Sequence, residues 1–144
     1  DIKKNFSYIF DLNNKSGRPR INLIEIEDNF IEQGIEVIPL KIKHRDWDIF
    51  GYRINNFAYI TDCSLIPDET FNSLYDLDLL ILDSLRYSAH EAHLSVDQAI
   101  EISNKLKPKR TVLTHMSSEL KYQDLVSYLP RNIVPGFDGM SIKI

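Results

Sequence analysis

The 144-residue chain contains one cysteine, no apolar run long enough to cross a membrane and no excess of positive charge. Cys63 alone excludes an internal disulfide framework and indicates a reducing compartment, so we expect a cytoplasmic protein without a membrane partner. Seventeen basic residues against twenty-one acidic ones give a net charge of −4, which argues against an extended nucleic-acid-binding surface. Because 43% of the residues are hydrophobic, the composition also excludes disorder and predicts a packed core.

The sequence also lacks an initial methionine and a polar leader. It begins at Asp1, and apolar residues at positions 2, 6, 9 and 10 already give this region the pattern of a structured segment. A native N-terminus more often begins with a frayed polar stretch. We therefore expect a segment to be missing upstream of Asp1.

The order of the predicted elements favours an α/β domain with a mixed sheet and flanking helices. Apolar runs predict strands at 21–26, 35–42, 50–54, 57–61, 79–82, 111–113 and 141–144. Turn-forming residues predict a loop at 13–20 and a hairpin at Asn55-Asn56. Helices are expected from Pro67, from the capping box Ser95–Gln98 as far as Pro108, and over 121–129.

Five residues that carry metal-binding chemistry lie at predicted strand ends or in loops. They are His44, Asp62, His90, His93 and His115. In α/β sheets, sites form where strands deliver their loops, and imidazole with carboxylate is the usual ligand set for zinc or manganese. Each residue alone has a simpler interpretation as a turn former or an ordinary surface histidine. The residues by themselves therefore leave a metal centre and a set of unconnected polar groups equally open.

Four linked blocks of sequence resemble a known family. They are Thr61-Asp62, His90-Glu91-Ala92-His93-Leu94-Ser95, Leu113-Thr114-His115-Met116 and Asp138-Gly139-Met140. In this order they make residues 35–144 similar to the C-terminal half of metallo-β-lactamase-fold hydrolases. The branch they resemble is that of the phosphoribosyl cyclic-phosphate phosphodiesterases, relatives of the tRNA-processing nuclease RNase Z. The resemblance implies that residues 1–144 form the C-terminal portion of one such domain, half of an αββα sandwich.

The resemblance also implies a function and the residues that perform it. Two divalent metal ions, zinc or manganese, would activate a water for attack on a small cyclic phosphate or a similar phosphodiester. His44 and His115 match histidine ligands, and Asp62 matches the carboxylate that bridges the metals, a metal-binding and catalytic role. His93 matches a catalytic histidine that binds no metal and acts near the scissile phosphate as a general acid. His90 is given only a supporting or surface role.

Asp83 has two interpretations at this stage. It ends the apolar run 79–82, where it would either orient His93 or cap the loop that follows. Capping is the interpretation we prefer, because aspartate commonly binds backbone N–H groups near a turn.

One departure from the family pattern is large. The motif His-x-His-x-Asp-His should precede His44, but residues 1–43 contain no histidine. The resemblance therefore implies that this chain alone is inactive, and that it self-associates or pairs with the missing N-terminal half. The face expected to pack against that half carries Ile60, Leu80, Leu82 and Leu113.

Two alternatives remain. A non-catalytic fragment or binding module would explain the missing motif. An RNA-processing nuclease of the RNase Z type would need a long tRNA-gripping arm and a basic surface, and the sequence offers neither a long insertion nor positive charge.

Overall fold

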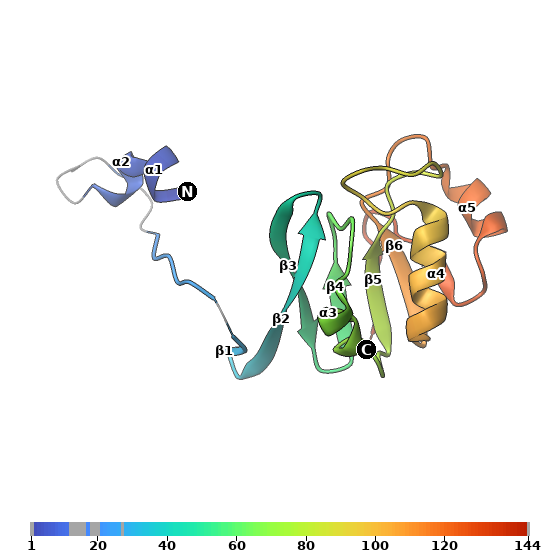
Figure 1. The fold of residues 1–144 in the computed structure, drawn as a ribbon, viewed down its shortest axis with the longest axis horizontal. Helices are drawn as coiled ribbons and strands as arrows, with labels where there is room; N and C mark the ends of the chain where they lie inside the picture. The colour runs from blue at the N-terminus through green and yellow to red at the C-terminus, as the bar shows by residue number, and fades with distance from the viewer. Residues whose placement is uncertain (1, 12–16, 18–20, 27, 144) are drawn as a thin grey trace.

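The computed structural model describes residues 2–11, 17, 21–26 and 28–143 of the chain. Two short helices, α1 (Ile2–Asn5) and α2 (Ser7–Phe10), bury no residue and lie away from the sheet in Figure 1. The loop predicted at 13–20 falls, except for Gly17, outside the described residues. None of the helices in the described part of the chain is long and apolar enough to cross a membrane.

A seven-stranded mixed sheet forms the body of the protein, with its strands in sequence order. They are β1 (Phe30–Glu32), β2 (Ile35–His44), β3 (Trp47–Ile54), β4 (Phe57–Ile60), β5 (Leu79–Asp83), β6 (Arg110–Thr114) and β7 (Ile133–Pro135). Strands β1 to β4 pair antiparallel, whereas β4 to β7 pair parallel. The mixed α/β sheet and the hairpin at Asn55, whose φ is 50°, are therefore confirmed.

Strand direction brings four strand ends to one edge. Two antiparallel steps, from β2 to β3 and from β3 to β4, restore the original direction, and β5 and β6 then continue parallel to β4. As a result, the C-terminal ends of β2, β4, β5 and β6 all lie at the same edge of the sheet (Figure 1). In open α/β sheets this is the edge where binding sites form.

Helices cover one face of this sheet. They are α3 (Asp68–Asn72), α4 (Val96–Leu106) and α5 (Tyr122–Tyr128), close to the predicted helices. The capping box is present, since Ser95 Oγ accepts from the N–H of Gln98 and the Gln98 side chain accepts from the N–H of Ser95. Beneath the helices lies the main core, which includes Leu40, Ile42, Ile60, Leu80, Leu82, Ala99 and Leu113.

The prediction about the apolar face is wrong. Ile60, Leu80, Leu82 and Leu113 are fully buried in the core cluster that the helices cover. The opposite face carries Phe50, Tyr52 and Tyr59, which are 37%, 37% and 38% exposed and which we call the open sheet face. The run 79–82 is apolar at every position, so its sequence does not reveal which residues face the helices.

Two predicted strands are absent, and two observed strands were not predicted. Residues 21–26 and 141–143 form no strand, whereas β1 and β7 do. Strand β7 is three residues long and ends in Pro135, too short to show a period-two pattern. Ile142 lines a cavity together with Tyr59, so the final segment lies along the open sheet face instead of extending the sheet.

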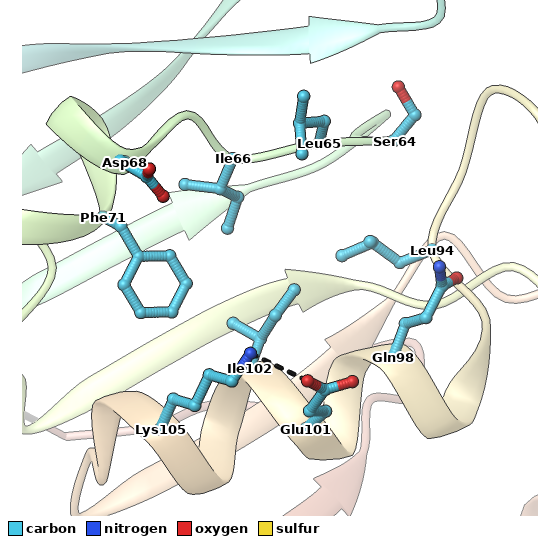
Figure 2. A pocket seen from close by; sticks show the side chains of 10 residues that line it. All are labelled: Ser64, Leu65, Ile66, Asp68, Phe71, Leu94, Gln98, Glu101, Ile102 and Lys105. Atoms are coloured by element: carbon cyan, nitrogen blue, oxygen red, sulfur yellow. Dashed lines mark ion pairs between the residues drawn. The ribbon is translucent and has the colours of Figure 1, made fainter.

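A groove opens between the segment Ser64–Phe71 and α4, as Figure 2 shows. Its cavity volume is about 380 Å³, and its apolar walls are formed by Leu65, Ile66, Phe71, Leu94 and Ile102. Lys105 Nζ lies 2.7 Å from Glu101 Oε1 at the rim of the groove. None of the four histidines lines this groove, so it is separate from the polar edge described next.

The capping box leads to a first testable prediction. Replacing Ser95→Ala leaves the N–H of Gln98 without its acceptor, and we expect a loss of about 1 kcal/mol in the free energy of unfolding. Urea denaturation followed by circular dichroism measures this loss. Ser118→Ala, in an exposed turn, is the matched control and should change stability by less than about 0.5 kcal/mol. Equal effects of the two substitutions would contradict the capping argument.

Candidate metal centre

The shared edge of the sheet positions four polar side chains. His44 is the last residue of β2 and Asp83 the last of β5, while Asp62 follows β4 and His115 directly follows β6. Asp62 and His115 both have left-handed backbones, with φ of 55° and 60°. Non-glycine residues seldom adopt this conformation, and such backbones are found disproportionately at functional sites. Both residues therefore turn sharply where their strands end.

A closed loop adds His93 to this edge. The N–H of Leu85 donates to the carbonyl of Leu94 at 2.9 Å, and the N–H of Val96 donates to the carbonyl of Arg86 at 3.0 Å. These bonds join the two ends of the segment between β5 and α4. The N–H of Leu94 also donates to Asp83 Oδ2 at 2.9 Å, which confirms that Asp83 caps this loop. His93 is thereby held beside the strand ends.

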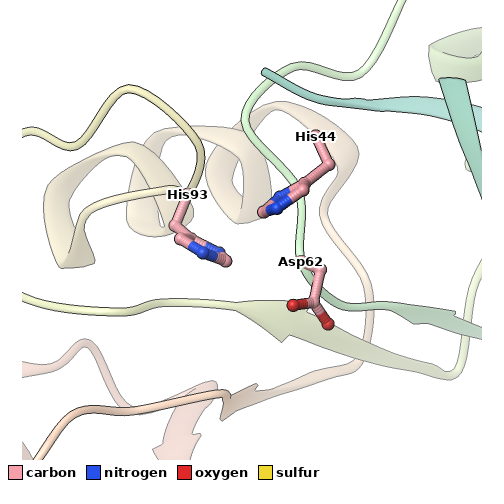
Figure 3. A group of neighbouring side chains, drawn as sticks. All are labelled: His44, Asp62 and His93. Atoms are coloured by element: carbon pink, nitrogen blue, oxygen red, sulfur yellow. The ribbon is translucent and has the colours of Figure 1, made fainter. Parts of the chain in front are cut away.

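The predicted site residues converge. The ring centroid of His93 lies 4.8 Å from that of His44 and 4.6 Å from that of His115. His115 Nε2 lies 3.5 Å from Asp62 Oδ1. Figure 3 shows His44, Asp62 and His93 pointing toward a common space. The sheet topology thus brings together residues that are up to 71 positions apart in sequence, from His44 to His115.

The side chains form two overlapping groups with metal-binding geometry. The ligand atoms of His44, Asp62 and His93 all lie within 4.8 Å of one another, and so do those of Asp83, His93 and His115. His93 belongs to both groups, although the resemblance gave it no metal. The division of roles among these residues stays a prediction. Asp83 is the member that sequence reasoning gave only a capping or orienting role, although its place after an apolar strand matched that of Asp62.

Burial shapes the electrostatics of the centre. Asp83 is 0% exposed, and burial raises the pKa of its carboxyl to about 6. Burial lowers the pKa of His93, and His115 and His44 lower it further. These effects favour a neutral His93 ring.

Unsatisfied atoms indicate that the residues fit a divalent cation. Asp83 Oδ1 and His93 Nδ1 are buried and have no hydrogen-bond partner among the described residues. Buried polar atoms are nearly always partnered, so two such atoms at one edge are notable. Imidazole nitrogens with carboxylate oxygens form a donor set suited to zinc or manganese. The donor set and its spacing therefore fit the implied metal ions.

The orientation of His44 is compatible with metal binding through Nε2. Its Nδ1 lies 3.1 Å from the carbonyl oxygen of Ala92, and a carbonyl can only accept a hydrogen bond. Nδ1 must therefore carry the proton, which leaves the lone pair on Nε2 available. A backbone carbonyl bound to the second ring nitrogen is the usual support of a metal-binding histidine.

Sequence comparison assigns the chain to a family. The family described as the Beta-lactamase superfamily domain matches residues 1–116, so the chain belongs to the β-lactamase superfamily. Its fold is that of the metallo-β-lactamase hydrolases. The match begins at residue 1 and therefore extends beyond the motif-bearing segment 35–144.

Individual relatives agree with this assignment. A crystal structure of a diphosphatase from the PhnP family is 34% identical, has a TM-score of 0.87, and matches 96% of this chain and 52% of its own. Human tRNase Z, short form, is 23% identical with a TM-score of 0.62, over 80% of this chain and 46% of its own, a likeness of fold alone. An octanoyltransferase from Porphyromonas gingivalis strain W83 is 32% identical over 147 residues, which are 99% of this chain and 30% of that protein. The chain thus spans about half of the PhnP-family structure and under a third of the transferase.

The buried Asp83 leads to a prediction about pH. Its folded pKa, about 6, exceeds the reference value of 3.8, so the metal-free folded state binds more protons than the unfolded state between these values. The contribution of Asp83 to stability is therefore greatest below pH 4 and falls as the pH rises through 6, by up to about 3 kcal/mol.

Asp83→Asn removes this titration and keeps an acceptor for the N–H of Leu94. In chemical denaturation with EDTA, we expect the variant to gain stability relative to the original protein as the pH rises from 4 to 7.5. Asp124→Asn on the exposed surface of α5 is the control and should show no such gain. Parallel pH profiles for Asp83→Asn and the original protein would show that the carboxyl is not held in this way.

Proposed function

We propose that the chain forms part of a metal-dependent phosphodiesterase that acts on a small cyclic phosphate or a similar phosphodiester. The observation that carries this proposal is the convergence of His44, Asp62, His93 and His115 at one edge of the sheet. Membership of the β-lactamase superfamily supports hydrolysis, and the 34% identity to a PhnP-family diphosphatase supports a phosphorus-containing substrate. The net charge of −4 favours a small substrate over a long nucleic acid.

In this proposal each residue has one role. His44, Asp62 and His115 would hold the divalent metal ions, with Asp62 as the ligand that both ions share. The metal ions supply the acidity that makes water a nucleophile near neutral pH. His93 donates a proton from Nε2 to the leaving oxygen, and Asp83 Oδ2, 3.6 Å from His93 Nδ1, orients the ring. The lowered pKa of His93 disfavours its protonated form, but the negative charge of a bound phosphodiester would favour it.

The alternatives have less support. An RNase Z-like nuclease rests on a fold likeness at 23% identity, and the acidic net charge of the chain opposes a grip on tRNA. The octanoyltransferase name belongs to a protein of which this chain spans 30%. A non-catalytic module would not need two buried, unpartnered polar atoms at the same edge. A cytoplasmic location is part of the proposal, supported by the free, buried thiol of Cys63.

We further propose that the open sheet face packs against a complementary half of the same kind of domain. Phe50, Tyr52 and Tyr59 expose aromatic surface on adjacent strands, and clustered apolar surface usually has a partner. This chain matches only 52% of the PhnP-family structure, which is therefore about twice as long. The rest of that structure is the kind of complementary half proposed here. Two metal ions also need more ligands than His44, Asp62 and His115 provide, because each ion takes about four.

This pairing predicts the behaviour of the isolated chain. Without a partner we expect it to be catalytically inactive and to self-associate through the open sheet face, as measured by sedimentation velocity at several concentrations. Tyr52→Glu places a charge on this face and should restore a monomer, whereas the control Tyr75→Glu, on another exposed aromatic, should not. A monodisperse monomer that binds two metal ions tightly would contradict the proposal.

The role of His93 gives another prediction, for protein that contains the complementary half. With bis(p-nitrophenyl) phosphate and added manganese or zinc, His93→Ala should lower turnover by about 100-fold or more and leave metal content unchanged. His115→Ala, the comparison variant, should lower both, because it removes a ligand. Metal content is measured by atomic emission. Parallel loss of metal and activity in His93→Ala would instead make His93 a ligand, which its position in both groups of side chains allows.

A further inference from the structure

One residue of the loop between β5 and α4, Ala92, contacts two histidines through its backbone. The carbonyl oxygen of Ala92 lies 3.1 Å from His44 Nδ1, and the N–H of Ala92 donates to His90 Nδ1, also at 3.1 Å. Arg45, next to His44, forms an ion pair with Glu91, next to Ala92, at 2.7 Å. The loop is therefore tied to the end of β2 by two adjacent residues, Glu91 and Ala92.

These two hydrogen bonds select opposite tautomers. A neutral imidazole has one N–H and one lone pair. His44 donates from Nδ1, so its lone pair is on Nε2. His90 accepts at Nδ1, so its proton is on Nε2. At Nε2, His44 thus offers a lone pair and His90 offers an N–H, although the backbone of Ala92 contacts both rings.

The opposite tautomers suit opposite charges. A metal cation binds the lone pair of a neutral imidazole, whereas an anionic oxygen binds an N–H. The ring centroid of His90 lies 5.1 Å from that of His93, and His90 belongs to neither group of metal-binding side chains. No described residue accepts a hydrogen bond from its Nε2. His90 therefore lies beside the centre with a donor available.

We propose that His90 binds a non-bridging phosphoryl oxygen of the substrate through its Nε2–H, while the backbone of Ala92, which fixes the tautomer of His90, also prepares His44 to bind metal. This inference rests on the proposed phosphodiesterase function for the nature of the ligand. It replaces the supporting or surface role that the sequence suggested for His90. The backbone of Ala92 thereby gives His44, at the end of β2, a group that binds a cation and gives His90, in the loop, a group that binds an anion.

The tautomers are testable without metal, substrate or activity. Nitrogen-15 NMR of the metal-free chain at pH 8, above the reference pKa of imidazole, distinguishes protonated from unprotonated ring nitrogens. We expect the proton on Nδ1 of His44 and on Nε2 of His90, with assignments from His44→Ala and His90→Ala. A proton on Nδ1 of His90 would overturn the inference.

Two substitutions separate the donor from the loop contact. In His90→Asn the side-chain oxygen can still accept a hydrogen bond from the N–H of Ala92, because asparagine commonly binds the backbone N–H two residues ahead. The Nε2–H, however, is lost. In His90→Gln the amide nitrogen reaches the place of Nε2 and restores a donor. Inorganic phosphate is titrated by calorimetry into each variant and the original sequence, in protein that contains the complementary half, at a zinc concentration that saturates the protein.

We expect His90→Asn to bind phosphate about tenfold more weakly than the original chain, and His90→Gln to recover part of the loss. Zinc binding should be unchanged in both, whereas His44→Ala should lose it. Phosphate binding that is absent from the original chain or unaffected by His90→Asn would overturn the inference, as would loss of zinc from His90→Asn. Phosphate binding that is independent of His90, with zinc binding intact, would leave the proposed function standing. Failure of the protein that contains the complementary half to bind zinc, with the original sequence, would count against that function itself.

Discussion

The common direction of β2, β4, β5 and β6 is the constraint on which the candidate centre depends. Each of these strands ends at the same edge, and each is followed or terminated by a polar side chain that reaches it. A register shift of one residue in β5 would move Leu80 and Leu82 out of the core and turn Asp83 to the opposite face. Burial of the core side chains therefore also fixes the positions of the polar side chains at the strand ends.

The shared edge of the sheet carries side chains and backbone conformations that each cost folding free energy. Asp83 is a buried carboxyl, His93 is packed among three other imidazoles, and Asp62 and His115 have left-handed backbones. Such features persist only where the surrounding structure determines them, here the parallel strands and the closed loop before α4. A cation at this edge would bind the lone pairs of neutral imidazoles and balance the negative charge of the carboxylates. The features that cost folding free energy are thus the same ones that would bind a metal ion.

Much of the fold and most of the site could be predicted from the sequence, because local signals determine them. The alternation in 35–42, the two asparagines of the hairpin and the capping box at Ser95 each act within a few residues. Asp62, His93 and His115 were found because they follow apolar strands or belong to linked motifs. Which face of the run 79–82 meets the helices depends on pairing between strands, and the tautomer of His44 depends on the carbonyl of Ala92, 48 positions away. Such properties arise from tertiary contacts, which no local pattern encodes.

In the proposed pairing, one complementary half would both complete the coordination and cover the open sheet face. Phe50, Tyr52 and Tyr59 lie on the face opposite the helices, while His44, Asp62 and His115 lie at the edge where strands β2, β4 and β6 end. A second sheet packed on the open sheet face would bring its own strand ends or loops to that edge, since packed sheets are only about 10 Å apart. Burial of the aromatic surface would then supply the free energy that brings further ligands to the metal ions. Assembly of the core and completion of the centre would therefore be one event, and the chain alone would hold only half of each.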